Sequence, residues 1–181
     1  VLFRSGPPAP KIKIATYNVA GLKQDTNDRN TYQPKWKEIL SWAKEEHIDA
    51  LCIQEHNCGP AQFNRLKQMA AAFQYCLILA HREGELETEE GSRGGAALLL
   101  NKRSFEVGAE KDEITTDHEG RLAIREVAWE GMIFKLASMY VPAEADYRKR
   151  YINKLHRTST LDKETIVGGD FNCVIKINHD V

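Results

Sequence analysis

The sequence predicts a layered α/β domain, with helices outside a mostly buried sheet or pair of sheets. Short apolar runs alternate with amphipathic segments in the first half of the chain, and strand-like runs then follow one another. The chain has 181 residues and is 42% hydrophobic, which is enough for one domain with a substantial core and too short for two comfortable ones.

The bulk composition excludes some classes of function. A formal net charge of -1 gives no overall attraction to nucleic acid or membrane, so contact with a polyanion requires a local patch or bound metal. No apolar run approaches the ~18 residues that span a bilayer, and no signal-peptide pattern is visible. The four cysteines lack a Cys-x-x-Cys pair, which favours reduced thiols. We therefore expect no membrane association and an intracellular location, nuclear or cytoplasmic.

The first half of the chain predicts strands and helices in alternation. Residues 1–10 are proline-rich and aperiodic, and we expect a disordered leader or an expression remnant, with one undivided domain over 11–181. Alternation and branched residues predict a strand, helical spacing of apolar residues predicts a helix, and a continuous apolar run predicts an interior strand. These rules give, in order, strand 11–19, helix 34–46, strand 48–55, helix 61–73 and strand 75–80.

Strands dominate the second half. Residues 81–92 are acidic and contain glycine, so we expect a surface loop there. A run of small and then large apolar residues predicts a strand, and three further strand candidates follow it. A polar helix comes next, and then a final strand that leads into two glycines. The predicted ranges are strands 94–100, 105–109, 121–129 and 132–140, helix 147–155 and the closing strand from 165.

Polar residues stand where four predicted strands end. They are Asn18, Glu55, Tyr140 and the pair Asp170 and Asn172. Function in layered α/β folds gathers at strand ends, because loops there shape a cleft. Each residue alone also has a plain structural interpretation, such as a turn, a solvated carboxylate or an Asx turn that closes a strand. Four strands that end in this way favour a site.

The residue types fit hydrolysis of a phosphodiester. Glu55 supplies a hard oxygen ligand for Mg²⁺, and Asn18 can brace that ligand. Asp170 can orient or deprotonate an attacking water, while Asn172 and the Tyr140 hydroxyl can donate to a phosphoryl oxygen.

Four motifs resemble the signatures of the endonuclease/exonuclease/phosphatase superfamily in order and separation. They are TYNVAGL at 16–22, IQE at 53–55, MYVP at 139–142 and GDFN at 169–172, supported by GGAALLL at 94–100 and RLAIREV at 121–127. The resemblance implies a four-layer αββα sandwich of the deoxyribonuclease-I-like type and a Mg²⁺-dependent phosphodiesterase, with Mn²⁺ as a substitute. It places Asn18 and Glu55 at the metal, and Tyr140, Asp170 and Asn172 at the scissile phosphate.

Within the superfamily, residues 169–174 are most similar to endonuclease domains of non-LTR (LINE-type) retrotransposons, which nick target DNA. The family pattern continues with a Ser-Asp-His-type motif and closing strands beyond GDFN. We therefore expect a domain truncated at its C-terminus, with His179–Asp180 a poor stand-in because its order differs. Two alternatives stay open, an inactive fragment that at most binds DNA or protein, and a lipid- or sugar-phosphate phosphatase of the same fold.

Other residues give weaker signals. The basic run at 148–150 can touch a phosphate backbone or be the solvated face of a helix, and Arg93 and Arg121 are further phosphate candidates. We expect His56 to be a surface histidine and Cys173 to be a small buried residue.

Truncation predicts self-association of the 181-residue chain, because missing strands leave an unpaired edge and uncovered apolar surface. Sedimentation velocity checks this expectation. A monodisperse monomer that unfolds cooperatively contradicts it.

Overall fold

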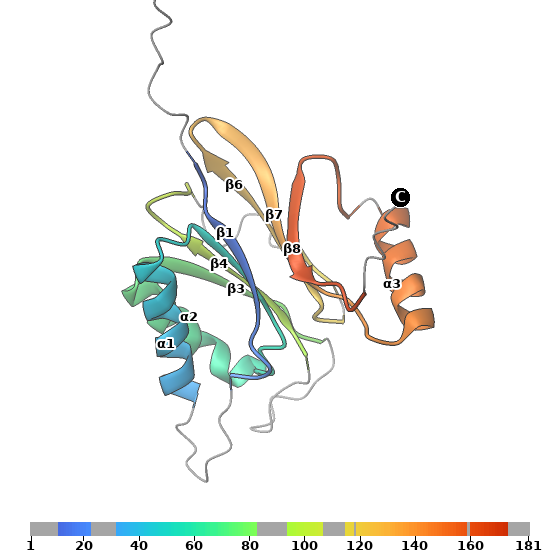
Figure 1. Cartoon of the computed structure of the whole chain (residues 1–181), viewed down its shortest axis with the longest axis horizontal. Coiled ribbons are helices and arrows are strands. Elements are labelled where there is room, and N and C mark those ends of the chain that lie inside the picture. Colours follow the sequence, from blue (N-terminus) through green and yellow to red (C-terminus); the bar gives the residue numbers. More distant parts are fainter. Residues whose placement is uncertain are drawn as a thin grey trace, which may run out of the picture.

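The computed structural model describes residues 11–22, 32–82, 94–106, 115–117, 119–158 and 160–173. The described elements form four layers, with α1 and α2 on one side of two stacked sheets and α3 on the other (Figure 1). In chain order they are β1 (Ile14–Asn18), α1 (Tyr32–Glu45), β2 (Ala50–Gln54), α2 (Pro60–Ala72), β3 (Tyr75–Leu79), β4 (Ala96–Asn101), β5 (Thr115–Thr116), β6 (Leu122–Trp129), β7 (Met132–Tyr140), α3 (Ala145–Arg157) and β8 (Thr165–Asp170). The αββα arrangement predicted from the sequence is confirmed.

Each sheet has four strands and one parallel pair. The first has the order β1-β2-β4-β3, with β1 parallel to β2, and the second has the order β5-β6-β7-β8, with β7 parallel to β8. Residues in register include Asn18 with Gln54 and Tyr140 with Asp170. The carboxyl ends of each parallel pair therefore lie side by side, and they include the polar residues that the sequence singled out.

Three apolar clusters account for the layering. The first packs α1 and α2 on the outer face of the first sheet, and includes Trp36, Leu40 and Leu99. The second fills the space between the sheets, and the third packs α3, through Tyr151 and Leu155, on the outer face of the second sheet. All five residues of β2 are buried, because the strand is covered on both faces. The continuous apolar run at 48–55 reflects this position.

Several predicted boundaries differ from the structure. The expected strand at 105–109 reduces, in its described part, to an isolated bridge between Glu106 and Ala128, and the short β5 was not predicted. The expected leader at 1–10 and most of the loop at 81–92 lie outside the described residues. No described helix is long and apolar enough to cross a membrane.

The two glycines before Asp170 lie inside β8, not beyond it. Neither has a positive φ, so their value is the space they leave and not unusual backbone angles. A Cβ at Gly168 would lie 2.7 Å from the Cys52 sulfur of the facing sheet, and one at Gly169 would collide with the Met139 carbonyl. Glycine here allows β8 to approach both the first sheet and β7.

Replacing Gly169 with alanine should lower the free energy of unfolding by about 3 kcal/mol or more, because the obstructing atom is backbone and cannot move aside. Gly131→Ala is the matched control. Gly131 has no neighbouring atom within 4 Å, and only its positive φ of 77° opposes a side chain, at about 1 kcal/mol. Urea unfolding measures both. Equal losses in the two variants would contradict the steric account.

Candidate active site

The amide of Asn18 joins the two sheets. Its Nδ2 donates one hydrogen bond to Glu55 Oε1 at 3.0 Å and another to Asp170 Oδ2 at 2.9 Å. Glu55 follows β2 in the first sheet, whereas Asp170 ends β8 in the second. Asn18 Oδ1 accepts a hydrogen bond from the Ala20 N–H at 3.0 Å, which fixes the amide plane. Asn18 therefore lies at the predicted site and braces its two carboxylates through nitrogen.

A buried hydrogen-bond chain ties the sheets together beneath these carboxylates. Thr16 Oγ1 donates to Gln54 Oε1, and Gln54 Nε2 donates to Ser138 Oγ, both at 3.1 Å. Ser138 Oγ donates onward to the Ile53 carbonyl at 3.0 Å. Gln54 and Ser138 are 1% and 0% exposed, so these bonds satisfy polar groups that water cannot reach. The sequence prediction missed both residues, although each interrupts an apolar strand.

Glu55 and Asn172 have left-handed backbone conformations, with φ values of 56° and 47°. Such values are uncommon outside glycine and persist where the surroundings hold them. The Gly21 N–H donates to the Glu55 carbonyl at 2.6 Å. Two residues later, Asn57 exchanges hydrogen bonds with Gly94, Oδ1 accepting at 2.6 Å and N–H donating at 2.8 Å. The Glu55 loop is thus clamped on both sides.

Tyr140 is half-buried beside Glu55. Burial, followed by the hydrogen bond and charge of Glu55, raises the pKa of the Tyr140 hydroxyl, while Arg121 opposes this shift. The Arg121 guanidinium lies 5.1 Å from the centre of the Tyr140 ring. Tyr140 consequently stays neutral at physiological pH and keeps its proton for donation.

Asp170 and Asn172 form an Asx turn at the end of β8. The Asn172 N–H donates to Asp170 Oδ1 at 2.9 Å, and Asn172 Nδ2 donates to the Val141 carbonyl at 2.7 Å. The plain and the functional interpretations of this segment are therefore compatible, because the turn is what aims the two side chains. A cavity of about 620 Å³ lies against them and against Asn18.

The five strand-end residues thus lie around one point between the sheets. Within the described residues, no three His, Cys, Asp or Glu side chains gather as a metal cluster. The site contains two carboxylates, those of Glu55 and Asp170, which both accept hydrogen bonds from the Asn18 amide nitrogen. Mg²⁺ takes one or two protein carboxylates and completes its shell with water, so this donor set fits it.

Residues 15–174 match the sequence profile of the Endonuclease/Exonuclease/phosphatase family. This chain belongs to the endonuclease/exonuclease/phosphatase family. Members of the family are generally hydrolases that depend on divalent metal ions.

Solved structures of family proteins share the fold. An AP endonuclease from Archaeoglobus fulgidus is 21% identical, with a TM-score of 0.58, and the alignment covers 90% of this chain and 58% of that one. TDP2 from D. rerio, complexed with a single-strand DNA product, is 20% identical (TM-score 0.56; 91% and 62% covered). The endonuclease domain of TRAS1, a telomere-specific non-LTR retrotransposon, is 13% identical (TM-score 0.53; 91% and 61% covered). This chain therefore spans about three fifths of the length of these family members.

Two minor expectations about residues beside the family motifs were wrong. His56 is fully buried, not on the surface: its Nδ1 accepts the Cys58 N–H at 3.0 Å, so Nε2 carries the proton donated to the Ala80 carbonyl at 2.9 Å. Cys173 is exposed, not buried. Arg93, His179 and Asp180 lie outside the described residues.

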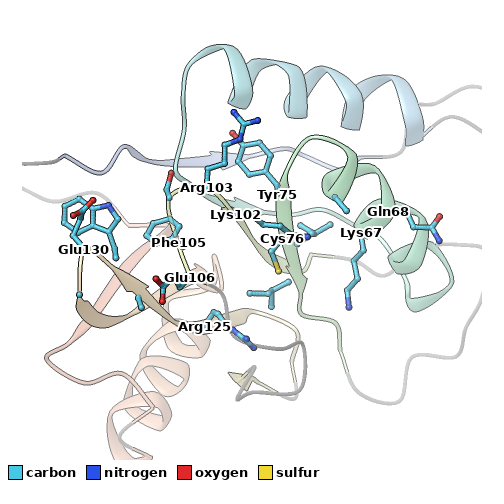
Figure 2. Close-up of a pocket in the computed structure, with 17 residues that line it drawn as sticks. Lys67, Gln68, Tyr75, Cys76, Lys102, Arg103, Phe105, Glu106, Arg125 and Glu130 are labelled. Atoms are coloured by element: carbon cyan, nitrogen blue, oxygen red, sulfur yellow. The ribbon is translucent and has the colours of Figure 1, made fainter.

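A cavity of about 1010 Å³ lies away from the strand-end site, and Figure 2 shows the side chains that line it. Its wall includes Tyr75 at the start of β3 and Gly131 in the turn between β6 and β7, which belong to the opposite ends of the sheets from the strand-end site. Lys102, Arg103 and Arg125 line it together with Glu106 and Glu130. None of the five strand-end residues lines this cavity.

Stability should fall as the pH falls from 6.5 toward 4. Desolvation lowers the pKa of His56 from 6.5 to about 4, so in this window the unfolded chain binds a proton that the folded chain does not. The loss is on the order of 3 kcal/mol by pH 4. Chemical denaturation at several pH values measures it. His56→Gln should flatten this pH dependence, whereas His156→Gln, at an exposed position, should not; parallel curves for both variants would contradict the assignment.

Proposed function

We propose that this chain is a metal-dependent phosphodiesterase that nicks DNA as the endonuclease domain of a retrotransposon polyprotein. One observation carries the chemistry: the carboxylates of Glu55 and Asp170, from different sheets, share the Asn18 amide nitrogen at 3.0 and 2.9 Å. Like charges this close repel, and a divalent cation relieves that repulsion. Membership of a family of generally metal-dependent hydrolases supports the same conclusion.

The residues divide the work as follows. Glu55, braced by Asn18, would hold Mg²⁺ or Mn²⁺, which when bound supplies Lewis-acid stabilisation of negative charge. Asp170 orients an attacking water and accepts its proton. The second amide hydrogen of Asn172 donates to the non-bridging oxygens, where charge grows during displacement. The neutral Tyr140 hydroxyl joins it by exchanging its hydrogen bond to Glu55 for one to the phosphate.

DNA is favoured as the substrate by two neighbours of this fold, the AP endonuclease and the TDP2 complex with a DNA product. The retrotransposon context is supported by the GDFNCV motif at 169–174 and by the similarity to the TRAS1 endonuclease domain. Since the net charge is -1, attraction to DNA would rest on the bound cation and local basic residues.

Conversion of supercoiled to open-circular plasmid in the presence of Mg²⁺ tests the proposed chemistry. Glu55→Gln and Asp170→Asn should each lower the nicking rate on the order of a thousandfold, because they remove charge at the metal and the water. Glu45→Gln, which alters an exposed carboxylate on α1, is the control and should nick normally. Unchanged nicking by folded Glu55→Gln protein would refute the assignment.

Substrate class and biological context need separate measurements. Phosphate release from inositol phosphates, with no plasmid nicking, would favour a phosphatase over a nuclease. A reverse-transcriptase domain encoded after Val181 would support the retrotransposon context, and a different neighbouring domain would contradict it.

A further inference from the structure

Arg148 turns inward from the basic helix α3. One of its terminal nitrogens, Nη1, donates to the Ala143 carbonyl at 2.8 Å and to the Asn172 carbonyl at 2.7 Å, and a third carbonyl, that of Pro142, lies 3.4 Å away. Nη1 carries two hydrogens, which matches the two short bonds. Its neighbours Lys149 and Arg150 are exposed. The run at 148–150 is therefore not one uniform charged surface.

The carbonyls that Arg148 holds belong to two different site loops. Pro142 and Ala143 follow Tyr140 at the end of β7, whereas Asn172 follows Asp170 at the end of β8. One guanidinium therefore connects the loop after the candidate phenol with the loop after the candidate carboxylate. Bonds from a charged donor are stronger than neutral ones, so this contact restrains both loops.

Asn172 depends on such restraint because its φ is 47°. Its N–H is bonded to Asp170, its Nδ2 to the Val141 carbonyl and its own carbonyl to Arg148. The first bond holds the Asp170 carboxylate against the turn, and the second holds the Asn172 amide against the chain that follows β7. The bond from Arg148 fixes the peptide that follows, and so completes the turn in its left-handed form.

We propose that Arg148 is a positioning residue, which acts through the backbone of residues 142–143 and 172 to hold Asn172 and Asp170 in the arrangement that the reaction needs. This inference rests on the proposed phosphodiesterase function. It assigns to Arg148 a role different from that of a phosphate-binding arginine. Both hydrogens of Nη1 are engaged by carbonyls, so a phosphate that bound through Nη1 would displace bonds that the loops require.

Steady-state nicking kinetics at several salt concentrations, with Arg148→Met, distinguish the two roles. Positioning predicts that kcat falls at least tenfold, while KM and the slope of binding affinity against salt stay near those of the parent. Arg148→Lys, which keeps the charge but not the planar donor group, should have an intermediate kcat. Lys149→Met, at the adjacent exposed position, is the control and should keep the parental kcat.

Amide hydrogen exchange supplies a readout that does not need activity. Arg148→Met should speed exchange of the Asn172 N–H, and Lys149→Met should not. If the parent chain does not nick DNA, the proposed function fails, but this exchange comparison still decides whether Arg148 holds the turn. A raised KM with unchanged kcat and a shallower salt slope would make Arg148 a phosphate contact, and unchanged exchange at Asn172 would overturn the positioning role.

Discussion

The shared hydrogen bonding of two carboxylates by one asparagine is the interaction on which the site depends. Asn18 ends β1 at the sheet edge and reaches Glu55 in its own sheet and Asp170 in the other. Without a common donor, the two charges would repel across the gap between the sheets. The amide holds the two carboxylates side by side, while its oxygen accepts a hydrogen bond from the Ala20 N–H.

The fold supports this bridge by letting the sheets approach and by locking the loops. Gly168 leaves room for the Cys52 side chain of the facing strand, and the buried Gln54–Ser138 hydrogen bond fixes the separation below the carboxylates. Left-handed backbone at Glu55 and Asn172 then turns both loops toward the gap. These restraints involve groups with little freedom of movement, which suits a site that must hold donors ready for a developing charge.

The sequence predicted the layers and the convergence at strand ends for a general reason. Carboxyl ends of parallel strands meet at one edge, so Asn18 is a neighbour of the residue that follows Gln54, and Tyr140 is a neighbour of Asp170, within their respective sheets. Predicting an apolar strand requires only local periodicity.

Errors arose where a residue's environment depends on elements distant in the chain. His56 follows a site carboxylate and so was predicted to be exposed, but it packs under Gly95 and donates to the carbonyl of Ala80, just beyond β3. The glycines of β8 are needed for their small volume, because Cys52 of the facing sheet and the Met139 carbonyl leave no room for a Cβ. Arg148 is in a charged run, and its inward turn depends on loops that begin at other strands. Local sequence carries no record of such partners.

Binding of Mn²⁺, followed by electron paramagnetic resonance, tests the central claim that Asn18 braces Glu55 as a cation ligand beside Asp170. The comparison is between the parent chain and Asn18→Leu, which keeps the approximate volume and removes both amide donors. The account predicts saturable binding by the parent and an affinity lower by about tenfold or more in the variant, as for the loss of a residue that orients a metal ligand. Equal, saturable binding by both proteins would contradict it.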